Sequence, residues 1–321
     1  MPVNDALATY SDWTFAAAGL IYLIALVFAL VEQAFGTRAR AKATRELVGA
    51  GAPAPETTET VDVPGDLPAG KPGRGERADR FGRMSVALVV LGALSHLASI
   101  VLRGFATGRA PWGNMYEYGA AVCLVAVVTW LVLLSRYDIR RLTPFVLLPV
   151  VFLMFIGGTI LYTDAAPVQP ALRSYWLVVH VSAAIVASGV LLVPGVASVM
   201  YLMKTSPRRF ASLRDRLPAA ETLDRLAYRS TVFAFPIFTF GVIAGAIWAE
   251  AAWGRFWGWD PKETVAFVAW VVYAAYLHAR ATAGWRGRQA AAINAFGFAV
   301  MVFNLFFINL VTAGLHSYAN G

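Results

Sequence analysis

Two kinds of side chain in this sequence could do chemistry together, a cluster of tryptophans and a small set of histidines. The segment Trp253-Gly-Arg-Phe-Trp257-Gly-Trp259-Asp260 places three of the chain's 10 tryptophans within a short stretch. Indole rings offer wide apolar contact with one polar N–H, and the intervening glycines let a flat molecule approach the backbone. The 4 histidines lie at positions 96, 180, 278 and 316. Because neutral imidazole is a normal ligand of haem iron, this combination predicts a haem site.

The composition indicates that membrane helices position these residues. Hydrophobic residues make up 58% of the 321, charged residues make up 14%, and the mean hydropathy is +0.59. These values exclude a soluble two-domain enzyme and predict an all-α, polytopic membrane protein. The single cysteine, Cys123, leaves no disulfide framework and no CxxC pair, so any thiol chemistry must come from a partner.

Apolar stretches of about 20 residues, long enough to cross a bilayer as helices, divide the chain. They lie at 13–35, 84–103, 117–135, 143–162, 174–203, 230–249, 263–282 and 290–313. We expect residues 1–35 to hold the first span, which lacks the flanks of a signal peptide, and residues 36–83 to form a disordered, basic, Pro- and Gly-rich cytoplasmic linker. Residues 84–321 then form the main membrane domain, with the Trp-rich loop at 250–263. Residues 210–228 are expected to form a short interfacial helix broken near Pro218.

Lysine and arginine predict the orientation of these spans. If the linker is cytoplasmic, the inner segments hold 22 of the 27 basic residues, as the positive-inside rule requires. Both termini then face outward. The net charge of +8 is explained by attraction to anionic lipid in the inner leaflet of the bilayer, so no nucleic-acid partner is expected.

This topology brings His180, His316 and the Trp-rich loop to the outer face. His180 follows Ser174, the start of the fifth span, by six residues and lies about 9 Å deep, whereas His316 directly follows the eighth span. Two imidazoles could bind one iron from opposite sides of a haem, each with a nitrogen about 2 Å from the metal. Each histidine alone could instead be a packing residue, and the tryptophans an interfacial belt.

The segment WGRFWGWDPKE resembles the WWD signature of the haem-handling proteins of cytochrome c maturation. Within them the chain is most similar to the CcsA/CcsB-type (ResC-like) family of the system II pathway. SYWLVVH and GLHSY match the family's two external histidines, and YAAYLHAR matches its membrane histidine. The resemblance implies transient bis-His binding of haem b. The predicted iron ligands are His180, His316 and His278, and the predicted contacts around the ring are Trp253, Trp257, Trp259 and Asp260.

Three further residues extend this prediction. His278 lies about 22 Å below the outer surface, so it would belong to a separate inner haem position, where the resemblance implies that the companion subunit supplies the partner ligand. His96, about 18 Å above the inner boundary, is either a ligand of that inner position or a packing or channel-lining residue. Arg255 is a candidate for binding haem propionates, because the guanidinium fork suits a carboxylate; interfacial snorkelling is the alternative. The same alternatives apply to the other outer cations, Arg103, Arg109, Arg173 and Lys262.

The resemblance implies a component of a cytochrome c haem lyase complex in the plasma membrane of a bacterium. With a ResB-like partner, it would deliver haem to the extracytoplasmic face and present it for thioether attachment to the CxxCH motif of an apocytochrome c. The sequence contains no clear general acid and no source of electrons, so whether the chain itself is an enzyme stays open. Three alternatives also stay open: a haem exporter without ligation activity, a CcmC-like haem-handling protein with about six spans, and a b-type electron-transfer subunit.

Overall fold

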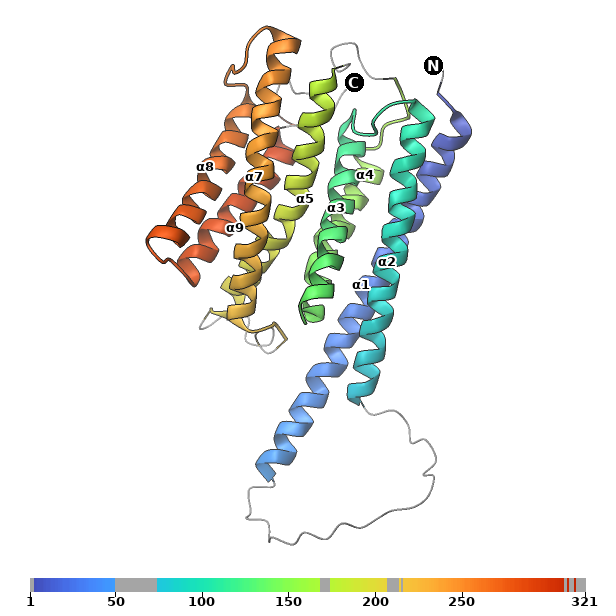
Figure 1. Cartoon of the computed structure of the whole chain (residues 1–321). Helices are drawn as coiled ribbons and strands as arrows, with labels where there is room; N and C mark the ends of the chain where they lie inside the picture. Colours follow the sequence, from blue (N-terminus) through green and yellow to red (C-terminus); the bar gives the residue numbers. More distant parts are fainter. Residues whose placement is uncertain are drawn as a thin grey trace.

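A computed structural model describes residues 3–49, 74–167, 174–206, 214, 216–308, 311 and 315, with side chains omitted for 37–49 and 74. The described chain is helical, and 8 helices are long and apolar enough to cross a membrane. This confirms the predicted all-α, polytopic fold. In chain order (Figure 1) the elements are α1 (Asp5–Gly49), α2 (Arg74–Thr107), α3 (Met115–Arg136), the 3₁₀ turn η1 (Arg140–Leu142), α4 (Thr143–Thr159), α5 (Tyr175–Lys204), α7 (Ala220–Trp253), α8 (Pro261–Thr282), α9 (Arg288–Phe303) and the π-helical turn η3 (Asn304–Ile308).

The helices around the predicted linker are longer than hydropathy alone suggests. α1 continues past residue 35 to Gly49, and α2 already begins at Arg74. The extension of α1 is rich in Ala and Arg, and the extension of α2 holds four Arg; both residue types favour helix, although neither segment is a long apolar run. They reach into the range 36–83 that hydropathy assigns to the linker, and residues 50–73 lie outside the described part of the chain.

The interfacial helix predicted for residues 210–228 is wrong from Ala220 onward. There the chain is already the first part of α7, and Leu223 and Leu226 are 0% and 5% exposed within the main hydrophobic core. Pro218 lies just before this helix, a position where a proline ring does not interrupt helical hydrogen bonds. Residues 207–213 and 215 lie outside the described part.

The spans form two neighbouring groups. α1 and α2 form a long hairpin that packs beside α3 and α4, while α5, α7, α8 and α9 form the other side of the bundle (Figure 1). A glycine permits close helix contact where the groups meet. A Cβ at Gly189 on α5 would lie 2.8 Å from the carbonyl oxygen of Val122 on α3, so only glycine fits at this distance.

A buried polar chain joins three helices of the second group. The Asn294 side chain on α9 accepts a hydrogen bond from Ser198 on α5 at 3.1 Å and donates one to Thr231 on α7 at 2.8 Å. All three residues are at most 1% exposed. Because these polar groups satisfy one another inside an apolar bundle, they fix the relative positions of α5, α7 and α9.

The two ends of the bundle differ in which helices begin and end there. At the upper end (Figure 1), α3, α5 and α8 begin and α7 ends; at the lower end, α3 and α5 end and α7 begins. α1 starts at the upper end. Which end faces the outside of a cell is set only by the positive-inside prediction.

Candidate functional site

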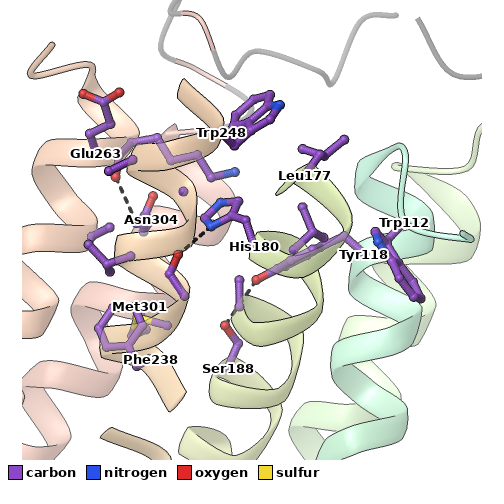
Figure 2. A pocket seen from close by; sticks show the side chains of 18 of the residues that line it. Trp112, Tyr118, Leu177, His180, Ser188, Phe238, Trp248, Glu263, Met301 and Asn304 are labelled. Carbon is purple, nitrogen blue, oxygen red and sulfur yellow. Dashed lines mark hydrogen bonds between the residues drawn. The ribbon is translucent and has the colours of Figure 1, made fainter. Parts of the chain in front are cut away.

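A cavity of about 180 Å³ lies at the upper end, where α3, α5, α7, α8 and α9 surround it and residues 254–260 border it (Figure 2). Its wall is mainly apolar and aromatic, with a few polar groups. The side chains that matter most for its chemistry are Trp112, Tyr118, His180, Trp248, Trp257, Lys262, Glu263 and Asn304. Of the predicted site residues that the structure describes, His180, Trp257 and the candidate cation Lys262 belong to this wall.

His180 is held against α7 by the backbone of that helix. Its Nδ1 lies 2.7 Å from the carbonyl oxygen of Gly241, and a carbonyl can only accept, so Nδ1 carries the proton (Figure 2). The other nitrogen, Nε2, is then the basic one, which is the arrangement found in histidines that bind metals through one nitrogen and donate from the other.

Glycine on α7 leaves the space that the His180 ring occupies. A Cβ at Gly245, one turn after Gly241, would lie 2.6 Å from both Cε1 and Nδ1 of His180, closer than such atoms can approach. The imidazole therefore occupies the space that a side chain would take on α7. On its other side it lies parallel to the indole of Trp248, with ring centroids 6.2 Å apart and an interplanar angle of 8°. We refer to Gly241, Gly245 and Trp248 as the His180 seat.

The three tryptophans of the Trp-rich segment occupy different positions. Trp253, the last residue of α7, packs edge-on against the buried Trp248 at 4.7 Å. Trp257 borders the cavity and is half-buried. Trp259 is 65% exposed and meets Trp257 edge to face at 5.8 Å. Of these three tryptophans, only Trp257 lines the cavity, while Trp253 packs against Trp248, which also lines it.

The loop between α7 and α8 has an unusual backbone. α7 ends at Gly254 in the left-handed conformation (φ 69°), and Trp259 has φ 56°, the one positive φ for a non-glycine residue in the described chain. Such a backbone is disfavoured for a bulky side chain and persists only where its surroundings hold it. The carboxylate of Glu263 does so by accepting hydrogen bonds from the backbone N–H of Gly258 (2.9 Å) and of Asp260 (3.1 Å).

Arg255 lies folded under this loop. Its guanidinium occupies the space that a Cβ at Gly258 would take, which explains the need for glycine there. Its Nη1 is buried and has no hydrogen-bond partner among the described residues. A buried, unsatisfied cationic donor is costly, so this group is available to bind an anionic group that enters the loop.

Asp260 connects three parts of the chain. It is 8% exposed, caps α8 by accepting from the backbone N–H of Lys262, and forms a capping box with Glu263. Its second oxygen accepts a hydrogen bond from the backbone N–H of Leu315 at 2.8 Å. Asp260 thereby joins the Trp-rich loop to the segment that immediately precedes His316 in sequence. His316 itself lies outside the described residues.

His278 and His96 lie away from this cavity. His278 is exposed on α8, 17 residues (278 − 261) after the first residue of the helix, or about 25 Å along its axis. His96 on α2 is 0% exposed, lies edge-on to Phe15 at 5.8 Å and Tyr22 at 6.0 Å on α1, and has the backbone of Ala120 on α3 as its polar neighbour. The structure thus separates the described histidines into a cavity residue, an exposed residue and a core residue.

Two of the outer arginines already have a partner. The buried carboxylate of Glu117 accepts from Nε of Arg103 at 3.1 Å and from Nη1 of Arg109 at 2.7 Å. It also accepts from the backbone N–H of Gly113 at 2.8 Å. Arg103 and Arg109 therefore hold the loop before α3 in place, and Lys262 is the cation that lines the cavity.

The sequence alone did not predict several of these residues. The His180 seat depends on glycines four apart on a helix followed by Trp248, a pattern that usually indicates helix packing alone. The role of Asp260 as a cap was readable, because Asp followed three residues later by Glu is a helix-start signal. Glu117 lies near the start of a helix, where an acidic residue is explained by the helix dipole alone, so its pairing with two arginines was not predicted.

The fold and the cavity define a multi-pass helical membrane protein with an aromatic, histidine-bearing pocket at one end. The family model described as "Cytochrome C assembly protein" matches residues 112–316. The chain therefore belongs to the cytochrome c assembly protein family, and its function lies in cytochrome c biogenesis. The resemblance to CcsA-type proteins inferred from the Trp and His motifs is confirmed.

Named relatives support this placement, and a solved structure shares the fold. "Cytochrome c biogenesis protein CcsA" of Guillardia theta is 35% identical over 243 residues, covering 67% of this chain and 79% of the relative. The protein of the same description from Prochlorococcus marinus (strain MIT 9303) is 36% identical over 279 residues, covering 74% and 85%. The solved structure titled "Cytochrome c Heme Lyase CcmF" superposes with a TM-score of 0.62 at 20% identity over 95% of this chain. This chain spans 47% of that longer protein, and the likeness shows a shared fold.

Proposed function

We propose that this protein binds haem b and presents it at the extracytoplasmic face of a bacterial plasma membrane for attachment to the CxxCH motif of an apocytochrome c. His180 and His316 are the proposed iron ligands. The observation that carries the proposal is the His180 seat: an imidazole whose Nδ1 is fixed by Gly241 stands in the wall of an aromatic cavity beside the Trp-rich loop. Asp260 links the same loop to Leu315, next in sequence to His316.

The cavity suits haem in chemistry but is small. Its wall offers an oriented imidazole, indole surfaces from Trp248 and Trp257, and the cation of Lys262. Its volume of about 180 Å³ is below the range of about 300–1,000 Å³ that is usual for pockets holding a sizeable ligand. Haem binding therefore requires part of the wall to move outward. The loop 254–260 is the part that can do so without separating packed helices.

Haem and apocytochrome are both substrates in this proposal. A cysteine S–H adds across each haem vinyl group, so a sulfur–carbon bond forms, the hydrogen goes to the other vinyl carbon, and no electrons are gained or lost overall. The task of the protein is orientation, because holding two reactants in a reactive geometry replaces a bimolecular encounter. His180 would fix the plane of the macrocycle, Trp257 would cover its face, and Arg255 or Lys262 would bind a propionate.

An inner haem position shared with a ResB-like partner forms the second part of the proposal. Val268, Val271, Ala275 and His278 follow one another at intervals of three and four residues, so they share one face of α8, and all four are exposed. Such a stripe of small and branched residues suits packing against a helix of another subunit within the membrane. His278 would then bind haem with a ligand from that partner before the haem moves to the outer site.

The test uses the chain purified with its ResB-like partner, and cells that co-express an apocytochrome c. His180→Ala should abolish the bis-His optical spectrum of the outer haem and the formation of covalent cytochrome, and added imidazole should restore both. His180→Phe provides the matched control, because its ring fills the space that imidazole would take and no rescue is expected. Full maturation in a double His180→Ala, His316→Ala variant would refute the proposed ligands.

A haem exporter without ligation activity is distinguished by the Trp-rich loop. Under the proposal, Trp257→Ala lowers both haem retained at the outer site and thioether formation. Trp285→Ala, which removes an exposed tryptophan far from the cavity, should leave both unchanged. If Trp257→Ala leaves thioether formation at the wild-type level while haem still crosses the membrane, the chain is an exporter.

A further inference from the structure

A second, larger cavity lies at the lower end of the bundle, opposite to the haem pocket. It measures about 1000 Å³ and is bordered by the lower parts of α1 and α2, the turn between α3 and α4, the end of α5 and the segment leading into α7. It therefore lies where the α1–α2 hairpin meets the rest of the bundle. In the proposed orientation this is the cytoplasmic edge of the membrane.

The wall of this cavity carries more positive than negative charge. Among the described residues, five cationic side chains line it, Arg140, Arg141, Lys204, Arg214 and Arg216, against three carboxylates, Glu32, Asp79 and Asp138. Its described lining contains no aromatic residue and no histidine. An apolar macrocycle such as haem would find no suitable surface here, whereas a hydrophilic anion would.

Two of these cationic side chains form bonds within the wall of the cavity. Arg140 bridges the hairpin by donating to Glu32 at 2.6 Å and to Asp79 at 2.7 Å. The ammonium of Lys204 donates to the carbonyl oxygens of Arg214 (3.2 Å) and Leu217 (2.9 Å), which fixes the segment before α7. These bonds hold the two sides of the cavity without filling the space between them.

Three guanidinium groups remain. Arg141, Arg214 and Arg216 form no ion pair within 4 Å of a carboxylate in the described part of the chain, although the charge of Arg141 acts on Glu32 from a greater distance. They come from two separate parts of the wall, the turn η1 and the segment before α7. The backbone of Arg141 is fixed, because its carbonyl oxygen accepts from the Gln33 side chain at 2.7 Å. Guanidinium forks bind phosphate oxygens in pairs, and basic pockets between membrane helices near the cytoplasmic surface suit acidic lipid head groups.

We propose that this lower cavity binds the phosphate head group of an acidic phospholipid. The head group would contact Arg141 on one side and Arg214 and Arg216 on the other, and so connect the α1–α2 hairpin region to the segment before α7. Each such cation near an anionic lipid strengthens attraction by about fivefold. Loss of all three should therefore weaken lipid binding by roughly 100-fold.

The experiment compares the full chain in lipid nanodiscs made of phosphatidylcholine with and without phosphatidylglycerol. The measurements are Tm and, by mass spectrometry, the phosphatidylglycerol that remains bound after purification in detergent. The cavity variant is R141Q/R214Q/R216Q. The matched control is R77Q/R80Q/R83Q, which removes the same charge from exposed positions at the lower end of α2 that do not line the cavity. An Arg→Lys triple at the cavity positions keeps the charge and checks folding.

We expect phosphatidylglycerol to raise the Tm of the wild type, the control and the Lys triple, and to stay bound to them. The cavity variant should lose both effects. Equal losses in the cavity variant and the control would overturn the proposal, because the lipid would then be attracted only by overall charge. If inorganic phosphate in phosphatidylcholine discs raised the Tm as much as phosphatidylglycerol does, the ligand would be a free anion and the lipid assignment would be wrong.

Discussion

A single methyl group on α7 should disable the proposed haem ligand without touching haem. In Gly245→Ala, the new Cβ would lie 2.6 Å from Cε1 and Nδ1 of His180, more than 0.5 Å inside the closest ordinary contact. The α5 and α7 backbones are fixed by packing and by the buried Asn294 chain, so the imidazole has to move. Its 2.7 Å hydrogen bond to Gly241 is then lost. Loss of a hydrogen bond that orients a metal ligand typically costs about 10- to 100-fold in metal affinity.

Gly241→Ala is the matched control for this change. It is the same substitution one turn earlier on the same helix, but its Cβ would meet Ala183 at 3.4 Å, an ordinary contact. Both variants gain the same intrinsic helix preference, up to about 1 kcal/mol, so a difference between them reports the histidine. Haem titration followed by the optical spectrum should show weaker binding only in Gly245→Ala. In a His180→Ala background, Gly245→Ala should have no further effect. Equal haem affinity in the two glycine variants would refute the idea that the seat positions His180.

Three other changes test separate parts of the structure. Asp260→Ala removes the α8 cap and the hydrogen bond to Leu315. The Tm should fall by the equivalent of about 0.5–2 kcal/mol, and the bis-His spectrum should weaken. Asp260→Asn is the control and should retain most of the cap. Glu117→Gln removes the carboxylate that Arg103 and Arg109 share and leaves Arg103 with Asp12 alone, at 3.5 Å, so thermal unfolding should show a loss of about 3–5 kcal/mol. An unchanged Tm would contradict the role given to this carboxylate. His278→Ala, assayed for haem stoichiometry with the partner present, should lower loading at the intact outer site as well, and full outer occupancy would exclude a relay.

Hydropathy predicted most of this fold because a bilayer permits few solutions. A span must satisfy its own backbone, so a long apolar stretch becomes a helix, and eight such stretches were readable. What hydropathy could not predict was where a helix continues into water. The extensions of α1 to Gly49 and of α2 back to Arg74 depend on helix propensity, and the start of α7 at Ala220 depends on tertiary packing of Leu223 and Leu226.

The sequence predicted how deep each histidine lies along its helix, but not which way its side chain points. Counting residues along a helix placed His180 near the outer loop, and the structure has it in the wall of the cavity beside that loop. The same counting could not say that His278 points away from the bundle or that His96 lies inside the hairpin, because helices that are apolar on most sides give little periodic signal. Nor could it assign Glu117 to Arg103 and Arg109, since these contacts join parts of the chain whose pairing only the fold determines.

At the upper end, a wall carried by packed helices faces a wall formed by a loop, and this arrangement suits the transient haem binding that we propose. On the fixed side, His180 is held by Gly241, Gly245 and Trp248, in helices that polar bonds lock together lower down. On the other side, Trp257 belongs to a loop whose α7 end is a left-handed glycine at 254 and which holds a disfavoured backbone at Trp259. Because that strain is relieved when the loop departs from its present conformation, opening costs less than parting two packed helices. A site that must accept haem and later release it attached to another protein needs such an opening.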